Sequence, residues 1–127
     1  MNNRITLKQA IDYVTRFRTR KIDLIKPEYV EKNILPTSET FDREAVDKLL
    51  ANPSCVKLRI YNGMSEDLNI RMILVGVDAK DQDILPLTEN TLLNGDEEGG
   101  DDDNEAIIVE EGVRCPPTCP PTSPLNP

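Results

Sequence analysis

Residues 94–105 consist entirely of Gly, Asp, Glu and Asn, and this run limits the possible folds more than any other segment. It contains seven carboxylates and no apolar side chain. Such a composition cannot bury enough surface to offset the entropy of ordering the chain, so we expect a flexible acidic loop. The domain core must then come from residues 1–93. The apolar residues 106–109 predict, over 106–113, a strand that returns to the sheet of the same domain.

The first helix is predicted by apolar side chains that recur three or four residues apart from Leu7 onward. Thr6 precedes this stripe, and Gln9 stands three residues after Thr6, which is the spacing of a capping box. We expect the helix to cover residues 6–20 and to extend toward residue 25. A short helical turn is expected next, at residues 28–32.

A second helix is predicted over the apolar residues between Phe41 and Leu50. Its N-cap is Ser38 or Thr40, because a hydroxyl there can accept hydrogen bonds from the free amides of the first turn. Asn52 and the proline after it end the helix. Both helices are expected to contribute to the core rather than to bind a cofactor.

Two strands are predicted next. Residues 55–61 alternate between apolar and polar side chains, and residues 69–77 form a longer apolar run. The Asn62-Gly63 pair between them predicts the turn of an antiparallel hairpin. We therefore expect an α+β domain with two main helices packed on a small, mainly antiparallel sheet of three to four strands. The expected core residues are Leu7, Ile11, Val14, Leu49, Leu50, Val56, Leu58, Ile60, Ile70, Met72 and Leu74.

The polar face of this hairpin is a candidate binding site. Placing Ile60 opposite Ile70 brings Arg59 next to Arg71 on that face. Like charges at opposite positions repel, so this pair needs an anion or an acidic segment. We expect residues 96–105 to provide that charge as a loose cover, since closing a loop of this length costs little extra entropy. The candidate binding residues on this face are Lys57, Arg59, Tyr61 and Arg71.

The acidic run also has the residue offsets of a calcium-binding EF-hand loop if Asn94 is taken as its first position. However, Asn94 replaces the usual Asp, Asp101 occupies a position that is normally apolar, and no helix pattern flanks the run. These departures favour weak, non-specific binding of a divalent cation over a true EF-hand. The residues that would supply the ligands are Asp96, Glu98, Asp102 and Glu105.

Cys115 and Cys119 stand four positions apart in a Pro-rich segment, and Cys55 opens the first strand. The first two thiols can be free, can bind a metal with ligands from elsewhere, or can take part in thiol redox chemistry. Their spacing and the prolines between them differ from the redox Cys-x-x-Cys motif. Since the chain begins without a secretory signal pattern, we expect the reducing cytoplasm and no structural disulfide.

Residues 114–127 are expected to form an extended tail outside the core, because they are rich in proline. Prolines recur there every three residues, which is the repeat of a polyproline II helix that aromatic grooves bind. The tail is therefore either a recognition segment or a plain extended terminus, and we expect it to be dispensable for folding. Its candidate contact residues are Pro117, Pro120, Pro121 and Pro124.

Composition excludes several classes of function. The chain has no histidine, which removes histidine-dependent catalytic triads and histidine metal sites. Its net charge is −8, and residues 81–127 contain 12 acids and one base, so nucleic acid is not an expected partner. No apolar run reaches the roughly 18 residues that a membrane span needs, so no membrane partner is expected. No glycine-rich phosphate loop is present, and no cofactor is expected.

These observations favour a cytoplasmic, non-enzymatic binding or assembly protein. It would contact a protein partner, or a second copy of itself, through the tail or through the basic face of the sheet. A metal-binding or thiol-redox protein that uses Cys115 and Cys119 is the alternative. A third hypothesis is an enzyme that holds an anionic substrate with Arg59 and Arg71.

Four runs of residues resemble an uncharacterised family of small bacterial proteins. The runs are FDREAVDKLLANP (residues 41–53), CVKLRIYNG (55–63), ILVGVDA (73–79) and the ending CPPTCPPTSPLN (115–126). The resemblance covers about residues 38–80 and 113–126. It implies no activity and no catalytic residues, but it suggests that the helix, the hairpin and the Cys/Pro tail occur together as one unit.

Overall fold

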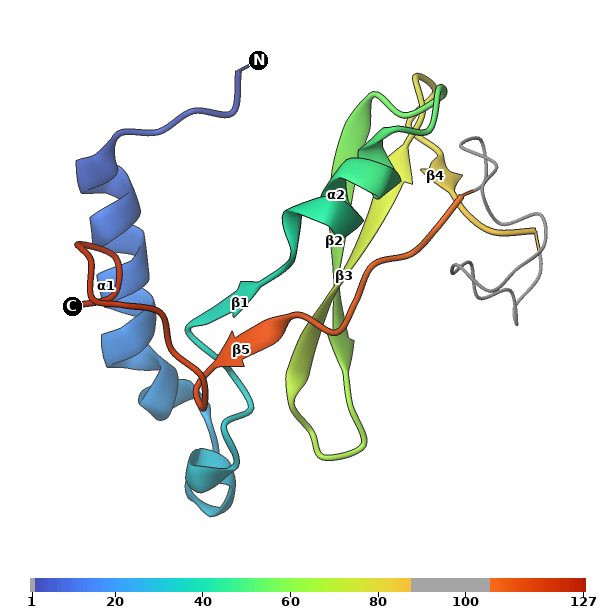
Figure 1. Ribbon diagram of the computed structural model, residues 1–127. Coiled ribbons are helices and arrows are strands. Elements are labelled where there is room, and N and C mark those ends of the chain that lie inside the picture. The colour runs from blue at the N-terminus through green and yellow to red at the C-terminus, as the bar shows by residue number, and fades with distance from the viewer. Residues whose placement is uncertain (1, 88–105) are drawn as a thin grey trace. The chain divides into compact units, whose positions relative to one another are not determined.

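The computed structural model describes residues 2–87 and 106–127, and its helices and antiparallel strands confirm the predicted α+β class (Figure 1). The chain divides into two compact units. Unit 1 contains Met1–Glu39, Met64–Ile70 and Val113–Pro127, and unit 2 contains Thr40–Gly63 and Arg71–Gly112. In the described part of the chain, no helix has both the length and the apolar character to cross a bilayer.

The longest element of unit 1 is the helix α1, Leu7–Leu24. The predicted capping box is confirmed, because Gln9 N donates to Thr6 Oγ1 at 3.0 Å and Thr6 N donates to Gln9 Oε1 at 2.8 Å. The helix ends at Ile25, whose backbone is extended. Leu7 lies in the first turn of α1 and is exposed, so its predicted place in the core is wrong.

A short 3-10 helix, η1, follows at Pro27–Lys32 and confirms the predicted helical turn. Asn33 then adopts the left-handed conformation, with φ at 55°, which asparagine tolerates better than most residues. The chain reverses at this point, and Ile34 O accepts a hydrogen bond from Ile70 N at 2.9 Å. This reversal sets the position of Ile34 and Leu35, the residues that follow Asn33.

A two-stranded sheet joins β1, Ser38–Thr40, to β5, Val113–Cys115. Thr37 N extends the pairing by donating to Cys115 O at 2.7 Å. The predicted N-caps Ser38 and Thr40 are wrong, because both residues belong to β1 and the next helix begins only at Arg43, with Asp42 as its N-cap.

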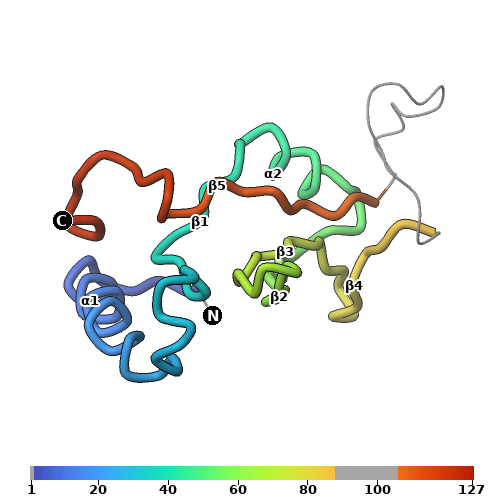
Figure 2. The backbone as a smooth tube through the Cα atoms, turned by 90° about the horizontal axis from the view of Figure 1, so that it is seen from below, coloured from blue at the N-terminus to red at the C-terminus, as the bar shows by residue number. Residues whose placement is uncertain are grey.

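The larger sheet has the strand order β2-β3-β4, formed by Lys57–Met64, Ile70–Val77 and Asp83–Ile84. The helix α2, Arg43–Leu50, follows the N-cap Asp42 and lies on one side of β2 and β3 (Figure 2). Val109 and Leu74 exchange backbone hydrogen bonds of 2.8 and 3.0 Å. The segment that follows residue 105 therefore returns to the sheet, but through a single bridge rather than a strand.

The core of unit 2 forms where α2, β3 and the returning segment meet. Leu49, Leu74 and Val109 are buried together, which confirms the predicted burial of the first two. Helix α2 covers β3 because its apolar side chains share one face of the helix. The partly buried residues packed against this cluster are Phe41, Ala45, Val46, Met72 and Ile107.

The predicted burial of β2 is wrong. Leu58 on β2 is 42% exposed, whereas Leu74 on the central strand β3 is 4% exposed. β2 stands at the edge of the sheet, and the buried cluster forms over β3 instead. The expected core residues that prove to be exposed are Leu7, Leu50, Val56, Leu58 and Ile60, and those that are only half-buried are Ile11, Val14, Ile70 and Met72.

The predicted hairpin register is also wrong. β2 continues through Asn62 and Gly63, and the chain reverses later, over residues 65–69, where a backbone hydrogen bond of 2.9 Å closes the turn. A Cβ atom at Gly63 would lie 3.1 Å from Arg71 O, so Arg71 is beside Gly63 and four residues away from Arg59. The two arginines are therefore not cross-strand neighbours.

Candidate functional site

The predicted basic face of β2 is paired with acids of the same unit. Arg59 Nη2 lies 2.8 Å from Asp81 Oδ1, and Arg59 Nη1 lies 2.6 Å from Asp83 Oδ1. Lys57 Nζ is 3.4 Å from Asp81 Oδ1, and the Tyr61 hydroxyl donates to Asp83 Oδ2. The structure thus brings Lys57, Arg59 and Tyr61 together around carboxylates rather than in an open cationic patch.

β4 and the turn before it position these carboxylates. Asp78 Oδ1 accepts hydrogen bonds from Lys80 N at 2.8 Å and from Gln82 N at 2.9 Å, which closes the turn. Asp83 then pairs with Val77 in the antiparallel register of β4 on β3. Short-range turn chemistry therefore places the acids that neutralise β2.

The hydrogen bonds at Asp83 explain the charge states of this cluster. Donation by the Tyr61 hydroxyl, followed by the Arg59 guanidinium, holds the pKa of Asp83 below its usual value. The same bond to Asp83 raises the pKa of Tyr61, because losing the phenol proton would break it. Asp83 also raises the pKa of Arg59. The cluster is thus compensated internally, which leaves little unpaired charge for a ligand.

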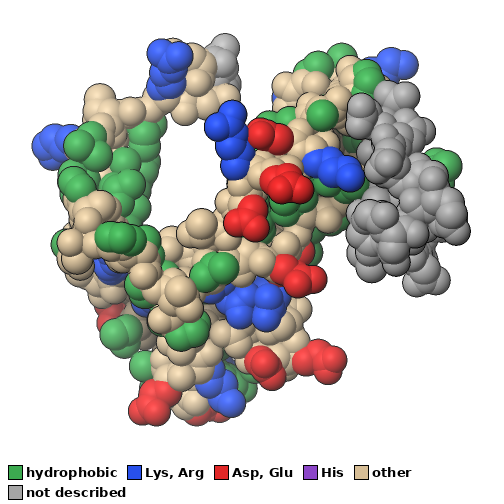
Figure 3. All heavy atoms as spheres, viewed as in Figure 1, with side chains coloured by type: hydrophobic (Ala, Val, Ile, Leu, Met, Phe, Trp, Pro, Cys, Tyr) green, Lys and Arg blue, Asp and Glu red, His purple; other side chains and the backbone are tan. Residues whose placement is uncertain are grey.

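Arg71 has an acidic partner of its own. Its Nη1 lies 3.3 Å from Glu110 Oε1. Glu110 directly follows Val109, the residue that bridges to β3. The cover expected from residues 96–105 lies outside the described residues. On the face shown in Figure 3, lysine and arginine side chains likewise stand next to aspartate and glutamate side chains.

The C-terminal segment is folded rather than extended. A disulfide joins Cys115 to Cys119, and Cys115 is only 3% exposed. Arg18 of α1 donates to Leu125 O and, at 3.2 Å, to Asn126 Oδ1. The prediction of an extended tail outside the core is therefore wrong, because the segment is held at two places. The candidate contact residues Pro117, Pro120, Pro121 and Pro124 are exposed.

The expectation of no structural disulfide is wrong as well, and with it the metal-ligand role of Cys115 and Cys119, because the two sulfurs are bonded to each other. Thr118 N donates to Arg114 O at 3.1 Å in the turn that brings the cysteines together. Among the residues that the structure describes, no three acidic or cysteine side chains are grouped closely enough to hold a metal. The acidic candidates Asp96, Glu98, Asp102 and Glu105 lie outside those residues.

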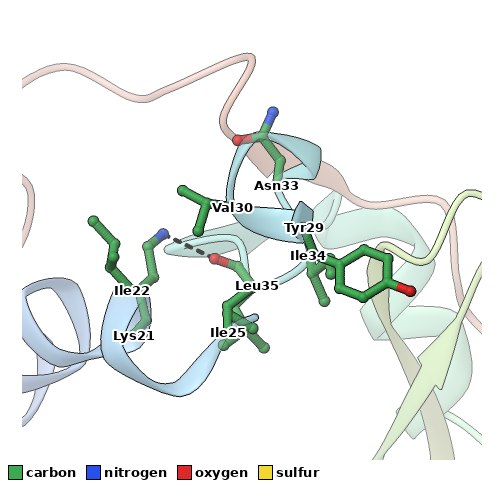
Figure 4. A pocket seen from close by; sticks show the side chains of 8 residues that line it. All are labelled: Lys21, Ile22, Ile25, Tyr29, Val30, Asn33, Ile34 and Leu35. Atoms are coloured by element: carbon green, nitrogen blue, oxygen red, sulfur yellow. Dashed lines mark hydrogen bonds between the residues drawn. The ribbon is translucent and has the colours of Figure 1, made fainter. Parts of the chain in front are cut away.

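A pocket that the sequence does not predict lies between the end of α1 and η1 (Figure 4). Its volume is about 150 Å³, which is enough for one branched aliphatic group or one aromatic ring. The reversal at Asn33 forms its far wall. The lining residues are Lys21, Ile22, Ile25, Tyr29, Val30, Asn33, Ile34 and Leu35.

Lys21 is the cation of this pocket. Its Nζ donates to Leu35 O at 2.9 Å, while the Tyr29 hydroxyl points away from it (Figure 4). Burial lowers the pKa of Lys21, and the nearby positive charge of Arg18 adds to the effect. A partly desolvated ammonium gains more from a neighbouring carboxylate than a fully hydrated one does, so Lys21 favours an anion at the pocket mouth.

A shallow groove of about 440 Å³ adjoins Lys21 on α1. Tyr13, Phe17 and Leu24 lie on one side of the helix, and Tyr13 is 61% exposed. The Lys21 ammonium lies 5.5 Å from the centroid of the Phe17 ring, within the range of a cation–π contact. Figure 3 shows apolar side chains along α1. The groove is lined by Tyr13, Arg16, Phe17, Arg20, Lys21 and Leu24.

We call the groove and the pocket together the Lys21 surface. The basic side chains of α1, judged by their sequence pattern alone, are typical of a solvated helix face. One signal could have found the groove, namely two aromatic residues four positions apart, Tyr13 and Phe17, interleaved with Arg16 and Arg20. The pocket has no such signal, because its far wall depends on the backbone reversal at Asn33.

The geometry of the Lys21 surface is the main evidence on function, because comparisons with known proteins add none. The chain matches no protein-family model, no curated protein and no solved structure. The resemblance to a family of small bacterial proteins therefore stays a prediction.

Proposed function

We propose that this protein is a non-enzymatic binding protein that uses the Lys21 surface to hold an acidic segment of a partner protein. The observation that carries the proposal is the exposed row of Tyr13, Phe17 and Leu24 next to an apolar pocket that contains the partly buried Lys21. The segment would carry acidic residues on both sides of one apolar side chain.

Charge complementarity selects an acidic ligand. α1 contains five basic and two acidic side chains, a balance of +3, in a chain whose net charge is −8. Arg16, Arg20 and Lys21 all line the groove. A carboxylate near Lys21 would offset the cost of burying its ammonium, because opposite charges a few ångströms apart favour the ionised forms.

The apolar part of the surface selects a ligand with a hydrophobic anchor. Large apolar side chains exposed in a row, flanked by polar residues, commonly mark interaction sites. The pocket beside them has room for one leucine or phenylalanine side chain. A bilayer offers no single side chain of that kind. These features favour a peptide segment over a membrane.

The proposal is tested with a fluorescein-labelled peptide in which leucines alternate with pairs of glutamate and aspartate. Fluorescence anisotropy should show saturable binding that weakens as the salt concentration rises, since exposed ion pairs are screened. A double variant, Arg16→Glu with Arg20→Glu, should bind about tenfold more weakly, because two attractions become repulsions. A peptide with serine in place of leucine should bind weakly to the unaltered protein.

The matched control changes charge by the same amount on the other helix. Arg43→Glu with Lys48→Glu alters two exposed cations of α2 and should leave binding within twofold. Equal losses in the two double variants would contradict the proposal, because they would show a general effect of net charge. Binding to vesicles with 30% phosphatidylserine, without binding to the peptide, would replace it with membrane attachment.

A further inference from the structure

The two bonded cysteines have different environments. Cys115 ends β5 and is almost completely buried, whereas Cys119 lies in the exposed turn that follows. Thr37 Oγ1 is 3.3 Å from Cys115 Sγ and 2.9 Å from Cys115 O. The hydroxyl has a single hydrogen and can rotate, so Thr37 can donate either to the carbonyl or to the sulfur. One sulfur is thus open to attack, and the other is placed to leave.

We propose that Cys115 and Cys119 form a reversible thiol–disulfide exchange site whose substrate class is a dithiol. In the first step a thiolate of the dithiol attacks Cys119 Sγ, and the bond between the two cysteines breaks. Its electron pair goes to Cys115 Sγ, which leaves as a thiolate that accepts a hydrogen bond from Thr37. Cys119 and the dithiol are then joined as a mixed disulfide.

In the second step the other thiol of the dithiol gives its proton to the Cys115 thiolate and attacks its own bonded sulfur. The mixed disulfide breaks, and the Cys119 thiolate takes from water the proton that the first thiol had released. The dithiol is oxidised to a disulfide, and the cysteine pair is reduced to two thiols. Two electrons and two protons are transferred in total.

A purely structural role explains this disulfide less well. A cross-link stabilises a fold mainly by restricting the unfolded chain, and the effect is smallest for a short loop such as the five residues closed here. The same segment is already held by the pairing of β5 with β1 and by the bond from Thr118 N to Arg114 O. Unit 1 should therefore keep its fold when the disulfide opens.

The first test measures reversibility in a Cys55→Ala background, so that only the bonded pair can react. The protein is equilibrated with mixtures of reduced and oxidised dithiothreitol, quenched with acid and labelled with a maleimide for intact mass measurement. Two labels should appear together as the reduced fraction rises and should disappear on return to the oxidant, with unchanged far-ultraviolet circular dichroism. The labelling is done in denaturant, so that the buried Cys115 thiol also reacts. A pair that stays oxidised in excess reduced dithiothreitol, or loss of helix signal on reduction, would overturn the proposal.

The second test measures which sulfur reacts. In the same background, Cys115→Ser leaves the exposed Cys119 thiol, and Cys119→Ser leaves the buried Cys115 thiol. The first variant should form a mixed disulfide with oxidised glutathione at least tenfold faster than the second. Equal rates, or the reverse order, would overturn the assigned direction of attack.

The third test addresses Thr37 as a positioning residue. Thr37→Val removes the hydroxyl but keeps the side-chain shape, so Cys115 becomes a poorer leaving group, and the rate at which dithiothreitol reduces the disulfide should shift downward by threefold or more. Thr19→Val is the matched control, because the Thr19 hydroxyl donates to backbone carbonyls within α1. An equal shift in both variants would remove Thr37 from the mechanism. None of these measurements uses the acidic peptide, so their failure is separate from failure of peptide binding.

Discussion

Replacing leucines on neighbouring strands measures where the core lies. Leu74→Ala on β3 empties a site that is 4% exposed and packed against Leu49 and Val109. Such substitutions cost about 2–5 kcal/mol, because apolar contact is lost and a cavity remains. Leu58→Ala on β2 removes a side chain that is 42% exposed. Full burial of a leucine side chain is worth about 1.5–3 kcal/mol, and somewhat more than half of the Leu58 side chain is buried. Its removal should therefore cost about 1 kcal/mol, and it leaves no enclosed cavity.

Urea unfolding followed by circular dichroism gives the free energy of unfolding of each variant. The slope of this free energy against urea concentration should be the same for both variants. We expect Leu74→Ala to be less stable than Leu58→Ala by about 2 kcal/mol. Equal losses would refute the reasoning, because they would mean that the apolar face of β2 is covered in the folded protein. A loss below about 0.5 kcal/mol for Leu74→Ala would place the core elsewhere.

Three further predictions concern single contacts. Asp83→Asn should lower the thermal midpoint at pH 6. The hydrogen bond from Tyr61 is the main reason that the folded-state pKa of Asp83 lies below its ordinary value of 3.8. The ionised Asp83 therefore stabilises the fold above pH 3.8, and this stabilisation is lost as the pH falls through the folded-state pKa. In thermal melts below about pH 4, the midpoint of the variant should fall less steeply with pH than that of the unaltered protein. Gly76→Ala should cost about 1–3 kcal/mol in urea unfolding, since its Cβ would lie 2.9 Å from Cys55 Sγ, and adding Cys55→Ala should recover part of that loss; no recovery would assign the cost to the backbone. Thr6→Ala should remove about 1 kcal/mol through loss of the capping box, seen as lower helix signal at 222 nm, and an unchanged melt would show that α1 does not depend on its cap.

Local patterns in the sequence were sufficient to predict α1 and the buried strand β3. The capping box of Thr6 and Gln9 uses atoms three residues apart, so its spacing alone predicts where α1 begins. The apolar run of β3 predicts a buried strand, since a central strand is covered by its neighbours and by α2. In each case the chain segment that carries the signal also forms the contact.

Burial on β2 could not be predicted in this way. The alternation of Val56, Leu58 and Ile60 correctly predicts a strand, but a strand at the edge of a sheet can leave its apolar residues exposed. The register failed for a related reason. Gly63 allows β2 to approach β3 closely, so the strand continues past a residue pair that usually forms a turn.

The candidate site could not be predicted either, because its contacts join residues that are far apart in the sequence or depend on backbone conformation. Asp81 and Asp83 compensate Lys57 and Arg59 because a turn 22 to 24 residues later brings them back, and no local pattern indicates that pairing. The Lys21 surface depends on the left-handed backbone of Asn33 and on the residues that follow it. The disulfide was not expected, because the prediction assumed a reducing compartment, and the spacing of Cys115 and Cys119 alone does not distinguish free thiols, a metal site and a bonded pair.

The pairing of β1 with β5 has a consequence for the order of events during synthesis. Thr37 and Cys115, which join the two strands, are 78 residues apart in the chain. While the ribosome is still producing the residues between them, β1 has no strand to pair with and exposes free backbone amides and carbonyls. Unit 1 can therefore complete its sheet only after translation has passed residue 115, and contacts between such distant residues form slowly. A nascent chain stalled before that point is the form most exposed to chaperones and proteases.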